Sequence, residues 1–357
     1  MQEKFWEFRE EIDKINSNIL ALLNIRTNLI KNIADLKDIS KIEYFDPVRE
    51  MEMLENIFKQ NKGPLSNDMV KEIFTAIFST NLRYMGIKRE KKMLISSEND
   101  GGFLKINEIF PFIENEPAII AGPCAIEKRE YLEGIASLLK SNKLRFLRGG
   151  AFKPRTSPYE FQGLGEDGLK ILSETGKKFN LFTVTEIVDP RDVDMASRYV
   201  DIIQIGARNM QNFELLKEVG QSKHPVLLKR GLNATMQEFM FAAEYIGIQG
   251  NRKIILCERG IRTFETKTRN TLDISCVPII KKETSLPIII DLSHSLGRKD
   301  IINPIAKAAI AVGADGLMLE VHPYPELAFS DSKQQLNPEE FINLLNNLQL
   351  KKSVFSA

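Results

Sequence analysis

Eight short runs of β-branched and apolar residues fill the carboxyl-terminal two thirds of the chain. Longer amphipathic segments separate most of them and are typical of crossover helices, for example 131–140, 212–220, 234–246 and 302–313. Eight strand-helix units predict a closed (β/α)8 barrel. An open doubly wound sheet is the alternative, but it usually has fewer strands and often a GxGxxG turn, which this sequence lacks. The runs span residues 117–124, 144–152, 181–188, 201–207, 225–231, 253–260, 286–294 and 316–322.

A helical module precedes the barrel. Apolar residues recur at three- and four-residue steps with no Gly or Pro between them, so we expect one long amphipathic helix from Phe5 to about Lys37. Asp46-Pro47 starts a second predicted helix, and Ser66 can cap a third. So long a first helix needs a second copy of the chain to cover it.

A polar stretch, rich in Lys, Glu, Ser and Asn, separates the two modules. We therefore predict a helical domain over 1–85, a linker over 86–116 and a barrel over 117–350.

Composition excludes several classes of protein. Lys and Arg number 49 against 48 for Asp and Glu, so the net charge of +1 gives no reason to expect nucleic acid as a partner. No apolar run reaches the roughly 18 residues of a membrane span. The three cysteines, Cys124, Cys257 and Cys276, lack both the spacing of a metal finger and the density of a disulfide framework. We expect a soluble, cytoplasmic protein with reduced thiols and no membrane partner.

Two cations fall on the apolar face of the first predicted helix. Arg26 follows Leu22 by four positions and Ile19 by seven, and Lys37 returns to the same face eleven residues later. Long side chains can reach water from such positions, which is one interpretation. The other is a polyanionic ligand held inside the helical bundle.

Cations also follow the predicted strands of the barrel. In a (β/α)8 barrel the active site forms at the carboxyl ends of the strands, so these side chains converge on one mouth. So many cations repel one another unless anions lie among them, which points to phosphate and carboxylate substrates. The set comprises Arg148, Lys153, Arg155, Arg208, Lys229 and Arg259.

The same strand ends carry a candidate metal site. Cys124, His294, Glu320 and Asp331 offer sulfur, nitrogen and oxygen ligands, a mixture that suits Mn, Fe, Co, Zn or Cu. His322 could replace His294 on spacing alone.

Eight segments of the barrel carry a family resemblance: IIAGPCA, LRGGAFKPRTSPYEFQG, IGARNMQNFELLK, PVLLKRG, ILCERGIRTFE, DLSHSLGR, LEVHPYPE and SDSKQQL. Together they resemble the type I 3-deoxy-D-arabino-heptulosonate-7-phosphate (DAHP) synthases. The resemblance implies a metal-dependent condensation of phosphoenolpyruvate with erythrose 4-phosphate, the first step of the shikimate pathway to aromatic amino acids. It also implies a divalent ion, Mn, Fe, Co or Zn.

The resemblance assigns roles to the candidate residues. It implies metal ligation by Cys124, His294, Glu320 and Asp331. Lys153, with the ligands His294 and Cys124, forms the implied catalytic set, and Lys153 is one candidate for protonating the new alkoxide, with a metal-bound water as the other. The implied phosphoenolpyruvate cations are Arg148, Lys153, Arg208, Lys229 and Arg259, and the implied erythrose 4-phosphate ligands are Arg155 and Thr156.

The helical module resembles the helical class of chorismate mutases. The residues that carry this resemblance, and that would hold chorismate or prephenate, are Arg9, Arg26, Lys37, Asp46, Arg49 and Glu50. It implies a domain-swapped dimer, and a tetramer for the whole protein. Met85 stands where that family places a Gln or Glu, and methionine has no proton to donate to the breaking ether. We therefore expect weak or absent mutase activity, with the module binding chorismate or prephenate for feedback inhibition.

Two alternatives stay open. One is a fully active bifunctional enzyme, with both mutase and synthase activity. The other is a 3-deoxy-octulosonate 8-phosphate synthase, which the segment KPRTS at 153–157 disfavours because that relative typically carries a KANRS-like segment there.

Overall fold

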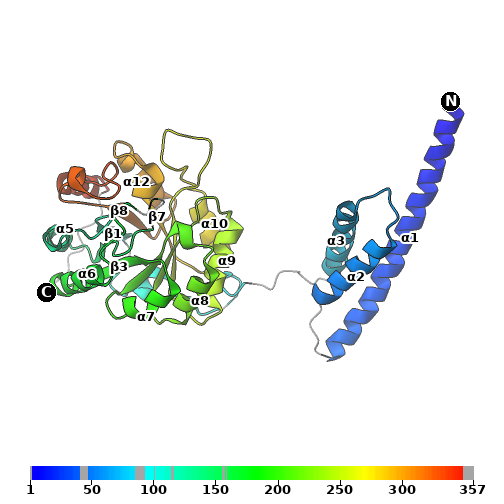
Figure 1. The fold of residues 1–357 in the computed structure, drawn as a ribbon, viewed down its shortest axis with the longest axis horizontal. Coiled ribbons are helices and arrows are strands. Elements are labelled where there is room, and N and C mark those ends of the chain that lie inside the picture. Colours follow the sequence, from blue (N-terminus) through cyan, green and yellow to red (C-terminus); the bar gives the residue numbers. More distant parts are fainter. Residues whose placement is uncertain are drawn as a thin grey trace. The chain divides into compact units, whose positions relative to one another are not determined.

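The structure, a computed structural model, describes residues 2–40, 47–84, 93–99, 101–113, 116–154, 157 and 159–348. It divides into two compact units, Met1–Lys92 and Met93–Ala357 (Figure 1). Four residues of interest from the sequence, Asp46, Met85, Arg155 and Thr156, lie outside the described residues. No helix in the described part of the chain is long and apolar enough to span a membrane.

The first unit is a set of three helices. They are α1 (Gln2–Ser40), α2 (Pro47–Gln60) and α3 (Asn67–Tyr84). Ser66 caps α3 as predicted, because its hydroxyl accepts a hydrogen bond from the Met69 amide at 3.3 Å. The apolar face of α1 is largely uncovered: Ile12 is 55% exposed and Leu29 59%.

The second unit is a closed barrel of eight parallel strands, in sequence order around the ring, which confirms the predicted fold class. Each strand is short and fully or almost fully buried, as expected for a parallel sheet covered on both faces. The strands are β1 (Ala118–Gly122), β2 (Phe146–Arg148), β3 (Phe182–Ile187), β4 (Ile202–Ile205), β5 (Val226–Lys229), β6 (Ile254–Glu258), β7 (Ile288–Asp291) and β8 (Gly316–Glu320).

Helices surround the strands (Figure 1). Their apolar faces and the outward side chains of the strands form the larger core. The α-helices are α4 (Ile106–Ile109), α5 (Arg129–Ser141), α6 (Glu166–Phe179), α7 (Val193–Ala196), α8 (Phe213–Gln221), α9 (Met236–Gly247), α10 (Cys276–Glu283), α11 (Leu292–Leu296), α12 (Ile302–Ala311) and α13 (Pro338–Asn347), and the 3₁₀ turns are η1 (Pro190–Asp192), η2 (Ala207–Asn209) and η3 (Pro325–Leu327).

The barrel interior has an apolar lower layer and a mostly polar upper layer. The lower layer contains Ile120, Phe146, Val184, Ile202, Leu227, Ile255, Ile289 and Met318. Side chains on a strand alternate between faces, so the residue two positions later also points inward. Those residues are Gly122, Arg148, Glu186, Gln204, Lys229, Cys257, Asp291 and Glu320. This second set forms the floor of the barrel mouth.

Part of the predicted linker packs against the barrel. Ile95 and Phe103 join the core between strands and helices, and Phe110 closes the lower end of the barrel interior. Phe110 meets the ring of Phe146 edge to face, with ring centroids 4.8 Å apart. The 93–113 segment therefore contributes to the core of the second unit, while the exact extent of a linker stays a prediction.

Candidate active site

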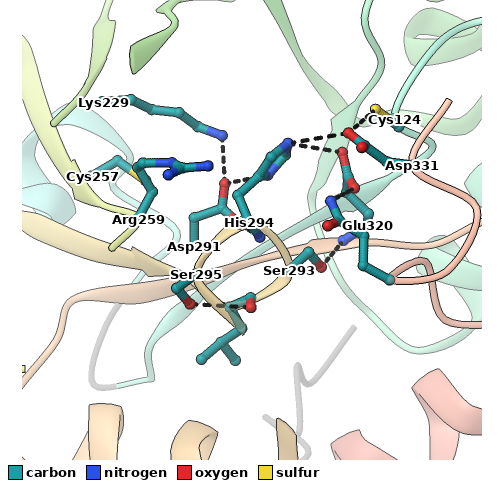
Figure 2. A network of polar contacts seen from close by, with 12 residues as sticks. Cys124, Lys229, Cys257, Arg259, Asp291, Ser293, His294, Ser295, Glu320 and Asp331 are labelled. Carbon is teal, nitrogen blue, oxygen red and sulfur yellow. Dashed lines mark hydrogen bonds and ion pairs between the residues drawn. The ribbon is translucent and has the colours of Figure 1, made fainter. Parts of the chain in front are cut away.

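Four predicted metal ligands meet at the carboxyl-terminal face of the barrel (Figure 2). The ligand atoms of Cys124, His294, Glu320 and Asp331 all lie within 4.8 Å of one another. Nε2 of His294 is 3.4 Å from a carboxylate oxygen of Glu320 and 3.8 Å from one of Asp331. Sγ of Cys124 is 3.3 Å from the same Asp331 oxygen.

Local structure explains how these side chains converge. Cys124 follows β1 by two residues and Glu320 ends β8, and these two strands are paired. His294 lies in α11, a short helix whose N-cap, Asp291, accepts a hydrogen bond from the His294 amide at 3.0 Å. Asp331 comes from the loop after β8 and has a φ of 52°, in the left-handed region.

Burial and charge set the protonation of these groups. Burial, reinforced by the charge of Glu320, raises the pKa of the Cys124 thiol to about 12 in the metal-free chain. The pKa of His294 is lowered because its ring is buried, although Asp291 and Glu320 oppose this effect. Burial alone would raise the pKa of Glu320, but His294 and Arg148 outweigh it and hold that pKa below its ordinary value.

This donor set fits a divalent transition metal. A neutral imidazole and ionised carboxylates are ready ligands, and a thiol loses its proton when a cation binds it. One sulfur, one nitrogen and two oxygen donors are the mixture expected for such an ion. The buried Glu320 carboxylate and the partly buried Asp331 carboxylate also lie close enough for a shared cation to relieve their repulsion.

His322 does not join this group. Its Nδ1 accepts a hydrogen bond from the Tyr324 amide at 3.0 Å, and its Nε2 faces Glu127 at 3.6 Å. The geometry therefore favours His294 over His322 as the imidazole of the ligand cluster.

Three predicted cations are paired with polar groups of this cluster and its surroundings. Nη1 of Arg148 lies 2.7 Å from Glu320, and both side chains are buried. Nζ of Lys153 donates to both the carbonyl oxygen and the sulfur of Cys124, each at 3.0 Å. Lys229 pairs with the buried Asp291.

Arg208 and Arg259, the other cations of that set among the described residues, open on a cavity of about 210 Å³ beside the cluster. Its wall includes Lys153, Arg208, Lys229, Arg259, His294 and Asp331. Arg148, the last residue of β2, is not among the residues that line this cavity. A larger cavity of about 590 Å³ lies at the opposite end of the barrel, beside α4, and contains none of the four ligands.

In the helical unit, two buried polar atoms have no hydrogen-bond partner among the described residues: Nη1 of Arg26 and Nδ2 of Asn81. Arg26 lies over the ring of Phe78, 5.0 Å from its centroid, and Asn81 accepts a hydrogen bond from Thr27 at 2.7 Å. Both atoms therefore lie in the region where α1 meets α3.

The other helical candidates are more exposed. Arg9 lies over Phe5, 4.2 Å from the ring centroid, and Arg49 pairs with Glu52 at 3.0 Å on the surface of α2. Lys37 and Glu50 are partly buried.

The sequence profile of the DAHP synthetase I family matches residues 107–355 of this chain. The chain belongs to the DAHP synthetase I family. The profile of chorismate mutase type II matches residues 8–85, so the helical unit is a domain of that type. Both results confirm the resemblance seen in the sequence, and they make the chain an enzyme of the DAHP synthase class.

Individual relatives of this chain support the same family assignment. A phospho-2-dehydro-3-deoxyheptonate aldolase of Thermotoga maritima is 57% identical over 231 residues, which cover 65% of this chain and 68% of the relative. A crystal structure of the DAHP synthase from that organism superposes with a TM-score of 0.69 at 52% identity and covers 73% of this chain and 77% of that one. A 2-dehydro-3-deoxyphosphooctonate aldolase of Syntrophotalea carbinolica is 31% identical over 252 residues, covering 65% of this chain and 90% of the relative.

Several polar residues at the mouth of this DAHP synthase barrel were missed from the sequence. Asp291 and Glu186 belong to the upper interior layer, and the alternation along β7 and β3 could have identified them. Arg269 contacts Asp331 at 3.1 Å and Gln334 at 2.6 Å, but it lies in a long loop whose sequence has no periodic pattern.

Proposed function

We propose that the barrel condenses phosphoenolpyruvate with erythrose 4-phosphate and requires a divalent metal ion. The observation that carries this proposal is the cluster of Cys124, His294, Glu320 and Asp331 beside a cavity lined by cations. Phosphoenolpyruvate carries a carboxylate and a phosphate, and Arg and Lys are the side chains that bind such groups.

The cations divide into two groups by their existing partners. Arg148 and Lys229 already face Glu320 and Asp291, so they are held in place before a substrate arrives. Arg208 and Arg259 line the cavity wall, where they can pair with the phosphate and carboxylate of phosphoenolpyruvate. Arg155 and Thr156, in KPRTS, are our candidates for the phosphate of erythrose 4-phosphate.

The reaction joins C3 of phosphoenolpyruvate to the aldehyde carbon of erythrose 4-phosphate. Water then adds at C2 and inorganic phosphate leaves, so the products are DAHP and phosphate. When bound, the metal supplies a Lewis acid for the aldehyde oxygen. Lys153 is our candidate for the proton donor to the new alkoxide, because its ammonium lies 3.0 Å from the ligand sulfur of Cys124.

An assay with two aldose phosphates tests the synthase assignment. Phosphate release from phosphoenolpyruvate should require erythrose 4-phosphate and should stop when a chelator removes the metal. Arabinose 5-phosphate is the substrate of the octulosonate relatives, some of which are about 30% identical to this chain. Faster turnover with arabinose 5-phosphate, or full activity after chelation, would contradict the proposal.

For the helical domain we propose a regulatory role: it binds chorismate or prephenate and inhibits the barrel. The buried nitrogens of Arg26 and Asn81, for which the described residues offer no hydrogen-bond partner, support an anionic ligand between α1 and α3. Arg9, Lys37, Asp46, Arg49 and Glu50 complete the proposed site. Adding prephenate or chorismate to the synthase assay should lower the rate, and Arg26→Ala should abolish that inhibition while leaving the uninhibited rate unchanged.

A second copy of the chain is our proposed cover for α1. Side chains such as Ile12, Ile19 and Leu22, each about half to two thirds exposed, form an apolar stripe along the helix. Burial against a second helical domain would give the dimer, and further association of such dimers would give a tetramer. Light scattering on the full chain should show a mass of two or four chains of 40.7 kDa each, and the mass of a single chain would contradict the proposal.

A further inference from the structure

The loop that supplies Asp331 is held from its amino-terminal side by one buried carboxylate. Oε1 of Glu127, in the segment after β1, accepts a hydrogen bond from the backbone amide of Phe329 at 2.7 Å. Oε2 of the same side chain faces Nε2 of His322 at 3.6 Å. The Glu127 side chain is 3% exposed and that of His322 is 1% exposed, so water competes little for the contact between these two side chains.

The hydrogen bonds of His322 define what it offers to Glu127. Its Nδ1 accepts a hydrogen bond from the amide of Tyr324, so the proton of the neutral ring lies on Nε2. That buried nitrogen has no hydrogen-bond partner among the described residues, and the carboxylate of Glu127 is the acceptor that it faces. The ring edge of Tyr131 fixes the imidazole from the side, with centroids 5.3 Å apart.

A second anchor holds the loop from its carboxyl-terminal side. Oε1 of Gln335 accepts from the backbone amide of Cys124 at 3.0 Å, and its Nε2 donates to the carbonyl oxygen of Ser330 at 2.8 Å. The hydroxyl of Ser330 lies 3.1 Å from the sulfur of Cys124.

The backbone between the two anchors is in a conformation that needs support. Asp331 has a φ of 52°, and a residue with a Cβ persists in this region only when its surroundings hold it there. The distance between the Cys124 sulfur and the Asp331 carboxylate therefore depends on contacts outside the ligand cluster.

We propose that Glu127 is a positioning residue for the metal site. Its carboxylate joins the segment after β1, which carries Cys124, to the loop after β8, which carries Asp331, and so sets the separation of these two ligands. This inference rests on the proposed metal site. It means that metal affinity also depends on residues that bind neither the metal nor the substrate. Outer contacts that orient metal ligands typically contribute 10- to 100-fold in affinity.

Cobalt binding to the full, metal-free chain tests the proposal. Co²⁺ with a thiolate ligand gives a charge-transfer absorption band, which reports on the contact with Cys124 separately from activity. Glu127→Ala should weaken Co²⁺ binding by about 10- to 100-fold and alter this band. Glu127→Gln should lose less, because its amide oxygen can replace only one of the two carboxylate oxygens that now face Phe329 and His322. His322→Asn, which keeps an acceptor for Tyr324, should also have a smaller effect than Glu127→Ala.

Glu244 provides a matched control. Its carboxylate also holds two backbone amides, those of Leu94 and Ile95 at 2.8 and 3.2 Å, but on α9, away from the ligand cluster. Glu244→Ala should lower the melting temperature of the metal-free protein and leave Co²⁺ affinity unchanged.

The outcomes separate this inference from the metal site itself. Unchanged Co²⁺ affinity and spectrum in Glu127→Ala and Glu127→Gln would overturn the positioning role but leave the assignment of the metal ligands unaffected. A wild-type chain that forms no cobalt-thiolate band would overturn both. If Glu127→Ala does not fold, Glu127→Gln and His322→Asn give the same comparison with smaller expected changes.

Discussion

Oδ2 of Asp291 lies 2.8 Å from Nδ1 of His294. The same oxygen accepts a hydrogen bond from the ammonium of Lys229, and all three side chains are largely or fully buried (Figure 2). Burial alone would raise the pKa of Asp291, but His294 and Lys229 hold it well below its ordinary value. One carboxylate therefore links a proposed metal ligand to a proposed phosphoenolpyruvate cation.

Asp291→Asn should impair both sites at once. The amide carries no charge to balance Lys229, and Nδ1 of His294 loses the carboxylate that orients its ring. We expect metal affinity to fall about 10- to 100-fold and the KM for phosphoenolpyruvate to rise. Competition with a chelating dye measures the first effect, and initial rates at saturating metal measure the second. A normal KM together with weakened metal binding would show that Asp291 acts on the metal ligand alone.

Much of the barrel could be predicted because its strands repeat one pattern. Each predicted run contains the observed strand, and Cys124, Arg148 and Glu320 are found at strand ends as expected. Asp291 and Glu186 were not predicted because the predicted runs 286–294 and 181–188 extend past them, so neither carboxylate marks the end of its run. Alternation places both in the interior layer, two residues after Ile289 and Val184.

Contacts between distant loops could not be predicted in this way. Arg269 reaches Asp331 and Gln334 across more than 60 positions of sequence, and Glu127 meets Phe329 across 202. No periodicity relates such segments, because the closure of the barrel, which pairs β1 with β8, brings them together. The cover of α1 is a further case, since its apolar stripe indicates a partner surface but not the arrangement of the two copies.

Cys124→Ala should abolish synthase turnover without unfolding the barrel. The substitution removes the sulfur ligand from a fully buried position, and we expect the rate to fall at least about 100-fold because Lewis-acid catalysis is lost with the ion. Cys257→Ala is the control, because that thiol is equally buried in the barrel interior but lies outside the ligand cluster. Phosphate-release assays measure turnover, and circular dichroism shows whether the barrel stays folded. Retained metal-dependent activity in Cys124→Ala would contradict the ligand assignment.

Metal affinity should rise with pH by about tenfold per pH unit near neutrality. The Cys124 thiol has a pKa of about 12 without metal, so it is protonated at pH 7 and must release its proton when the ion binds. His294 has a lowered pKa and is already neutral, so it releases none. Cobalt dissociation constants between about pH 6.5 and 8.5 should give a slope near one. A flat profile would show that the thiol stays protonated and does not ligate.

Met85→Gln should turn the helical domain into a faster chorismate mutase. The resemblance to the helical mutases places Met85 where that family carries a Gln or Glu, which donates a hydrogen bond to the ether oxygen of the substrate. Restoring one transition-state donor is worth about 10²- to 10³-fold in rate. Met85→Leu is the matched control, since it keeps an apolar side chain without a donor. The rate of chorismate consumption by each full-length variant measures the effect. The rate of DAHP synthesis by the same preparation is the reference. If Met85→Gln is no faster than Met85→Leu, another residue occupies the donor position. A wild-type mutase rate already equal to that of Met85→Gln would contradict the proposal that the domain is mainly regulatory.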